Sequence, residues 1–60
     1  MYNLGELRKI RKVPIARITL ALGISRTQYW NIENKKAHIT PNKKAKLAEL
    51  FMVKVNDIDW

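Results

Sequence analysis

The chain has 60 residues, a formal net charge of +7 at pH 7, and no cysteine. This length allows one domain, residues 1–60, and such short chains bury only about 60% of their unfolded surface. The absence of cysteine excludes disulfides and thiolate metal sites. No apolar run approaches the ~20 residues of a membrane span and no signal-peptide core is present, so we expect a cytoplasmic protein.

The excess of basic residues favours a polyanionic partner, with nucleic acid as the first candidate and an anionic membrane as the second. A membrane role is disfavoured because the basic cluster has no outward aromatic and apolar face to insert. The cluster consists of Arg8, Lys9, Arg11 and Lys12. The five acids are dispersed, His38 has no acid–base partner nearby in sequence, and no glycine-rich phosphate loop occurs. We therefore expect no enzyme activity, no cofactor and no metal.

Two helices are predicted in the first third of the chain. Apolar residues at three-residue spacing predict a first helix that is capped by Asn3 and ends near Lys12. Its core-facing positions are Leu4, Leu7 and Ile10. Pro14 disfavours helical geometry at Val13 but suits the opening of a second helix, which runs to about Leu22. The packing positions of this second helix are Ile15, Ile18, Ala21 and Leu22.

The segment from Leu20 to Glu33 predicts two helices joined by a tight turn. Gly23 supplies the left-handed backbone conformation that ends a helix in one residue. Ser25 caps the next helix by accepting a backbone N–H, and Ile24 is expected to be buried under the turn. In a small basic protein this arrangement predicts a helix-turn-helix unit at about residues 15–34. The second helix of such a unit can enter the DNA major groove.

The second half of the chain predicts a fourth helix and a short closing element. After a polar, basic loop over residues 34–40, Thr40 and Pro41 form an N-cap followed by proline in the first turn. The apolar residues of the fourth helix are Ala45, Leu47, Ala48, Leu50 and Phe51. The closing turn or fifth helix carries Val53, Val55, Ile58 and Trp60. The predicted fold is all-α, a small bundle of four to five helices.

The third helix, which starts after Ser25 and ends near Asn34, has two chemically different faces. At about 100° per residue, Tyr29 and Ile32 point to the core. The outward residues are Arg26, Thr27, Trp30 and Asn31, with Gln28 at the edge. Arginine can pair with guanine, asparagine with adenine, and threonine can contact a thymine methyl group. The alternatives are an ordinary polar surface, and a Trp30 that folds back over a neighbouring helix.

These motifs resemble the Cro/CI-like (Xre-type) helix-turn-helix domains of phage and bacterial repressors. The matching segments are Leu4-x-x-Leu7-Arg8, Leu22-Gly23-Ile24-Ser25, Tyr29-x-x-Ile32-Glu33-Asn34, Pro41 and Leu47-Ala48-x-x-Phe51-x-Val53-x-x-x-Asp57-Ile58. The resemblance implies a lambda-repressor-like fold in which the outward residues of the third helix face the bases. It also implies that Pro14, Ile15 and Asn34 lie against the phosphate backbone. Arg8 and Glu33 would form a buried salt bridge between the first and third helices.

The chain departs from the family pattern at several positions. Pro14 and Ile15 stand where the second helix usually opens with a capping residue and glutamine, so one phosphate contact is lost. Lys35 and Met52 occupy positions where glycine is common. Lysines after the third helix and at the start of the fourth are expected to compensate by contacting phosphates, with plain solvation as the alternative. The predicted phosphate-contacting residues are Ile15, Asn34, Lys35, Lys36 and Lys43.

We therefore expect a sequence-specific DNA-binding transcriptional regulator of the bacterial cytoplasm or a phage-infected cell, acting on operator DNA without a small-molecule ligand. One reading helix covers few base pairs, so a weak homodimer, formed in solution or on DNA, is expected. Its predicted surface is Phe51, Val55, Ile58 and Trp60, and closure of the core by these residues is the alternative. The alternative function is an antirepressor or antitoxin-like module that binds another protein. Its contact surface would be Trp30, Phe51, Met52 and Trp60.

Overall fold

The computed structural model describes all 60 residues and contains four α-helices and one short 3₁₀ helix. These elements are α1 (Leu4–Ile10), α2 (Ile15–Leu22), α3 (Arg26–Glu33), α4 (Pro41–Phe51) and η1 (Val55–Asp57). The all-α prediction is confirmed, and the closing element is a single 3₁₀ turn. None of the helices combines the length and the apolar character that crossing a bilayer requires.

Most helix boundaries follow from local hydrogen bonds, as predicted. The side-chain oxygens of Asn3, Ser25 and Thr40 each accept a backbone N–H three residues further on, at the starts of α1, α3 and α4. Gly23 ends α2 with a φ of 67°, a left-handed conformation that costs glycine little. The predicted caps and the Gly23 turn are therefore confirmed.

Three further turns hold a residue other than glycine in the left-handed region. Lys12, Lys35 and Met52 have φ values of 54°, 59° and 57°. A side chain in this conformation costs roughly 1–2 kcal/mol. Lys35 and Met52 are the two positions where the family that the chain resembles commonly has glycine. The backbone geometry of a glycine turn is thus kept at both places without glycine.

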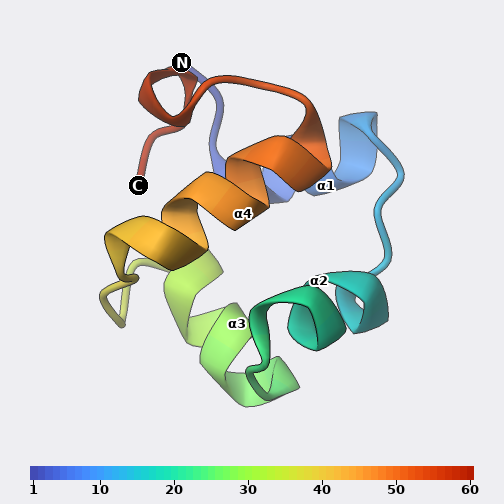
Figure 1. Ribbon diagram of the computed structural model, residues 1–60, viewed down its shortest axis with the longest axis vertical. Helices are drawn as coiled ribbons and strands as arrows, with labels where there is room; N and C mark the ends of the chain where they lie inside the picture. The colour runs from blue at the N-terminus through green and yellow to red at the C-terminus, as the bar shows by residue number, and fades with distance from the viewer.

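Figure 1 shows α4 running across the middle of the molecule, with α2 and α3 on one side of it and α1 behind it. The two chain ends lie together beyond the opposite side of α4. Tyr2 and Ile58 form an isolated parallel bridge, in which the Tyr2 N–H donates to the Asp57 carbonyl at 2.9 Å and the Asp59 N–H donates to the Tyr2 carbonyl at 2.7 Å. The segment after α4 is therefore tied to the residues that precede α1.

The side chains that point inward form one core cluster. Its members are Leu4, Leu7, Val13, Ile18, Leu22, Tyr29, Ile32, Leu47, Ala48, Phe51 and Ile58. The inward orientation of Tyr29 and Ile32 agrees with the predicted faces of α3. Ile24 is only partly buried and packs against the cluster beneath the α2–α3 turn.

Some predicted core positions lie outside the core. Ile10 is 59% exposed, whereas Val13 is buried. Residues three apart drift by about 60° around a helix per step, so Ile10 lies about 120° from Leu4 and leaves the buried face. The chain turns after α1 and brings Val13 into the core instead. Ala21, a predicted packing position of the second helix, is likewise exposed.

The C-terminal residues close the core, which corrects the predicted dimer surface. Phe51 and Ile58 are fully buried within the single chain, because the segment after α4 folds back over the core. Trp60 is partly buried, and its indole N–H donates to the Val55 carbonyl at 3.1 Å. Phe51 and Ile58 therefore cannot form a surface between two copies, and Phe51 is unavailable to the alternative protein-binding surface as well.

Candidate nucleic-acid interface

The outward side of α3 carries the residues predicted to contact bases. Arg26 and Thr27 are exposed in its first turn, and Trp30 is 52% exposed one turn later. Asn31 is partly buried. The only acidic residue of α3, Glu33, is turned away from this side towards α1. The outward side of α3 therefore presents hydrogen-bond donors without a carboxylate among them.

Gln28 has a structural role that the sequence analysis missed. Its side-chain oxygen accepts the Ser25 N–H at 2.7 Å, while its own N–H donates to the Ser25 hydroxyl at 3.1 Å. This reciprocal pair is a capping box, and the Ser-x-x-Gln pattern of the sequence signals it. Only the amide nitrogen of Gln28 remains free to donate to a ligand. The box also fixes the first turn of α3, which carries Arg26 and Thr27.

The loop after α3 folds back onto Trp30. The ammonium nitrogen of Lys36 lies 5.0 Å from the centroid of the Trp30 ring, within the range of a cation–π interaction. The side-chain amide of Asn34 donates to the Trp30 carbonyl at 2.8 Å. Two of the predicted phosphate-contacting residues, Asn34 and Lys36, thus contact α3. The Asn34 amide nitrogen is used within the protein, whereas the charge of Lys36 stays exposed beside Trp30.

Lys35, a predicted phosphate contact, is already paired within the protein. Its ammonium group forms an ion pair with the Asp59 carboxylate at 2.8 Å, and both side chains are about half exposed. The two residues are 24 positions apart, so no local pattern in the sequence could indicate the contact. Because an exposed pair of this kind is worth at most about 1 kcal/mol, a phosphate could displace Asp59.

The first turn of α2 leaves backbone donors open. Its N-cap residue, Pro14, makes no side-chain capping hydrogen bond. The N–H groups of Ile15 and Ala16 have no acceptor within the protein. Since backbone N–H groups at a helix N-terminus bind anions, this end of α2 can receive a phosphate oxygen. Ile15 remains a predicted phosphate contact through its backbone.

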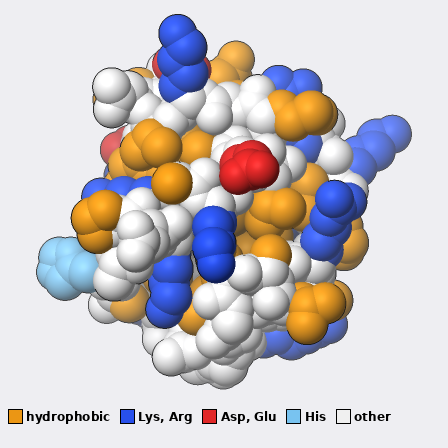
Figure 2. Space-filling model, in the orientation of Figure 1, with side chains coloured by type: hydrophobic (Ala, Val, Ile, Leu, Met, Phe, Trp, Pro, Cys, Tyr) orange, Lys and Arg blue, Asp and Glu red, His pale blue; other side chains and the backbone are white.

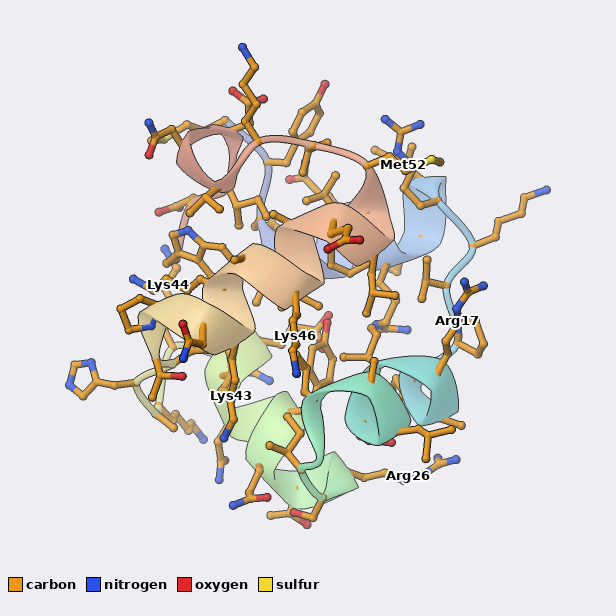
Figure 3. The ribbon with its side chains drawn as sticks, in the orientation of Figure 1. Arg17, Arg26, Lys43, Lys44, Lys46 and Met52 are labelled. Atoms are coloured by element: carbon orange, nitrogen blue, oxygen red, sulfur yellow. The ribbon has the colours of Figure 1, made fainter.

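Lys43 lies beside α3. It lines a hollow of ≈ 150 Å³ together with Gln28 and Asn31 of α3. In Figure 3, Lys43 extends from α4 towards α3, while Arg26 lies at the N-terminal end of α3. Positive charge is therefore present on one flank of α3 and at its N-terminal end, as contact with a polyanion would need.

Arg8 and Glu33 form the ion pair expected between the first and third helices. Two guanidinium nitrogens of Arg8, Nε and Nη2, each donate to Glu33 Oε1 at 3.3 Å. The pair is only partly buried, since the Arg8 and Glu33 side chains are 27% and 13% exposed. Gly5 makes room for it, because a Cβ atom at Gly5 would lie 2.9 Å from Glu33 Oε1. The pair thus holds α3 against α1 but is more solvated than predicted.

Tyr29 is the buried neighbour of this pair. Its hydroxyl group is buried and has no hydrogen-bond partner. Burial, and then the nearby Glu33 carboxylate, raise the pKa of Tyr29 from 10.0 to about 12, although the Arg8 guanidinium acts in the opposite direction. The side chain therefore stays neutral at physiological pH and contributes to packing, not to the interface.

A shallow, open hollow with mostly apolar walls lies between α2 and α3. Its lining residues are Ile15, Arg26, Thr27 and Trp30, and its volume is ≈ 320 Å³. Ile15 is the only one of the four that comes from α2. The hollow opens on the same side as the predicted base-contacting residues, so a ligand lying along α3 would cover it.

A second, larger groove lies on the other flank of α2. It has a volume of ≈ 470 Å³ and is lined by Arg11, Val13, Arg17, Ala21, Lys46, Glu49, Leu50 and Met52. Figure 3 shows Lys46 extending from α4 towards the space between α4 and α2, with Arg17 and Met52 near the same edge of the molecule. In Figure 2 apolar side chains are visible on this face, surrounded by many basic side chains and few acidic ones.

No group of three His, Asp or Glu side chains lies close enough together to hold a metal ion. His38 is exposed in the loop before α4. Comparisons with protein-family models, with curated proteins and with solved structures found no match to this chain.

Proposed function

We propose that this chain is a sequence-specific DNA-binding transcriptional regulator. In this proposal α2 and α3 form a helix-turn-helix within a lambda-repressor-like fold, and α3 enters the major groove. The observation that carries the proposal is the outward side of α3. Arg26, Thr27 and Trp30 are exposed there, while Glu33 is turned inward to Arg8. Such a face offers donors to base edges and no negative charge to the phosphates.

The surroundings of α3 support contact with the phosphate backbone. The open N–H groups of Ile15 and Ala16 offer donors at the start of α2. Lys36 beside Trp30 and Lys43 beside Asn31 supply positive charge on either side of the reading face. The net charge of +7 adds a long-range attraction to nucleic acid. These groups would set the position of the protein on DNA, while the outward residues of α3 would select the sequence.

The proposal includes a homodimer formed on operator DNA. One helix of eight residues reaches too few base pairs to select a site by itself. Two copies on half-sites about 34 Å apart would double the number of bases read. Because Phe51 and Ile58 are buried in each chain, the contact between copies would use side chains other than these.

The test is a binding-site selection from random DNA duplexes, followed by affinity measurements on the selected site. Arg26→Ala should weaken binding to that site by about 1–3 kcal/mol and relax the preference at one base pair. Lys36→Ala should weaken binding to all sequences about equally and reduce the slope of affinity against salt by about 1. Lys54→Ala, at an exposed lysine next to η1, is the matched control and should change neither quantity.

An unchanged sequence preference in Arg26→Ala would refute the assignment of this side of α3 to base contacts. A selection that yields no preferred sequence would refute the proposal as a whole. The result for Arg26→Ala reports on binding because Arg26 is exposed, and its replacement leaves the core untouched.

A second candidate is a protein-binding module that uses the same fold. It is favoured by the groove between α2 and α4, where Met52 is 73% exposed beside Leu50 and Ala21. The dependence on salt separates the two candidates. Binding through phosphates weakens steeply as salt rises, whereas an apolar contact between proteins changes little.

A further inference from the structure

The hollow between α2 and α3 is lined by four residues that come from two helices. Arg26 and Trp30 are four residues apart and Thr27 precedes Trp30 by three, so all of them share one side of α3. Ile15 reaches the same hollow from the first turn of α2. The walls are mostly apolar, and no carboxylate is among the lining residues. The site is therefore suited to a small apolar group attached to a negatively charged or polar ligand.

One of the walls is held in place. Ile15 is partly buried and packs against the core cluster, which supports its side chain from behind. Lys36 lies over the Trp30 ring at 5.0 Å but does not line the hollow, so the space beside the indole stays open. A wall that is already ordered loses little conformational entropy when a ligand group enters.

We propose that this hollow receives the C5 methyl group of a thymine in the DNA major groove. The inference rests on the proposed function, because it requires α3 to lie along base edges. Among the four bases only thymine presents an apolar group in the major groove. Arg26 borders the hollow and can donate to a neighbouring guanine or phosphate while the methyl group sits against Trp30 and Ile15. Trp30 and Ile15 are thus specificity-determining residues at one base pair of each half-site.

The test replaces each thymine of the selected duplex in turn by deoxyuridine, which removes the C5 methyl group and keeps the O4 acceptor. Affinities are measured by fluorescence anisotropy at constant salt. We expect one thymine in each half-site at which the change to uridine weakens binding about fourfold, the factor that corresponds to burying one methyl group. A cytosine at that position should bind better by a similar factor when it carries a 5-methyl group, because the same methyl group is restored.

Protein variants connect this preference to the hollow. Trp30→Ala and Ile15→Ala should each abolish the difference between thymine and uridine at that position. Leu20→Ala, also in α2 but 85% exposed and outside the hollow, is the matched control and should keep the fourfold difference. Circular dichroism establishes that each variant is folded. Two variants are used because a local rearrangement caused by one substitution would not be expected to occur in the other.

The outcomes separate this inference from the proposed function. Sequence-specific binding with no thymine sensitive to loss of its methyl group would overturn the hollow assignment and leave the proposed function standing. A sensitive thymine whose preference survives in both Trp30→Ala and Ile15→Ala would also overturn it. If the selection yields no preferred duplex, both this inference and the proposed function are overturned.

Discussion

Tyr29 and Trp30 are neighbours in the sequence and represent the two sides of α3. The Tyr29 side chain has 0% of its surface exposed, whereas Trp30 is 52% exposed. Successive residues of a helix point about 100° apart, and here that step places Tyr29 on the buried side of α3 and Trp30 on the exposed side. The inner side of α3 therefore contributes to the stability of the fold, and its outer side is exposed and free to contact a partner.

The same division holds for the two ion pairs near the end of α3. Glu33 pairs with Arg8 on the inner side, where the two side chains are 13% and 27% exposed, while Lys35 pairs with Asp59 in a position that is half exposed. A partly buried pair contributes more than an exposed one, because solvent screens it less. Changes on the inner side should therefore affect stability, and changes on the outer side should affect binding.

The largest expected effect separates the two aromatic neighbours. Tyr29→Ala should lower the free energy of unfolding by about 3–5 kcal/mol, because it opens a cavity in the core. Trp30→Ala should lower it by less than about 1 kcal/mol, as exposed positions usually do. Urea denaturation followed by circular dichroism measures both. Equal losses in the two variants would mean that Trp30 also belongs to the core.

The second prediction concerns pH and the inner side. The pKa of Tyr29 is raised from 10.0 in its ordinary state to about 12 by burial and by Glu33. The raised pKa of Tyr29 adds to the free energy of unfolding. This contribution is fully present below pH 10 and is lost as the pH rises through about 12, because the hydroxyl proton of Tyr29 leaves the unfolded chain at a lower pH than the folded one. The loss amounts to at most about 2–3 kcal/mol.

Tyr29→Phe is the control for this prediction. It removes a buried hydroxyl group that has no partner, so its stability at neutral pH should equal or slightly exceed that of the parent. Urea denaturation of both proteins between pH 8 and pH 12 should show the parent losing stability relative to the variant above pH 10. Curves that stay parallel would show that Tyr29 titrates normally.

The third prediction compares the two ion pairs. Glu33→Gln should cost about 1–2 kcal/mol, which is less than the roughly 3–5 kcal/mol of a fully buried pair because solvent reaches Arg8. Lys35→Ala should cost less than about 1 kcal/mol. Thermal unfolding at low and high salt measures both effects. If Glu33→Gln melts within a degree or two of the parent, the inner pair is as weak as the outer one.

The smallest expected effect tests the close approach of α1 to Glu33. Alanine in place of a helical glycine usually adds about 0.5–1 kcal/mol of stability. At Gly5 the new Cβ would lie 2.9 Å from Glu33 Oε1, so in the parent this gain should be offset by displacement of the carboxylate from Arg8. In a Glu33→Ala background Gly5→Ala should become stabilising. A double-mutant cycle measures the difference, and additive effects would contradict the contact.

The sequence by itself determined the starts of α1, α3 and α4, the end of α2 and the two sides of α3, whereas α1 ends at Ile10, before the predicted end near Lys12. Asn3, Ser25 and Thr40 accept N–H groups only three residues away, and Gly23 ends α2 through its own backbone freedom. Interactions of this range depend on neighbouring residues alone, so a pattern of residue types is enough to predict them. The capping box of Gln28 is equally local and was within reach of the same reasoning.

Only the tertiary structure decided which side chains close the core and which charges are free. Phe51 and Ile58 are buried by a segment that folds back to Tyr2, and Lys35 pairs with Asp59 from 24 positions away. The hollow is lined by Ile15 of α2 and by three residues of α3, so it exists only where these two helices pack together. Periodicity shows that one side of a helix is apolar or charged, but it carries no information about the element that covers that side. What covers it depends on the packing of distant segments, which the order of residue types along the chain does not encode locally.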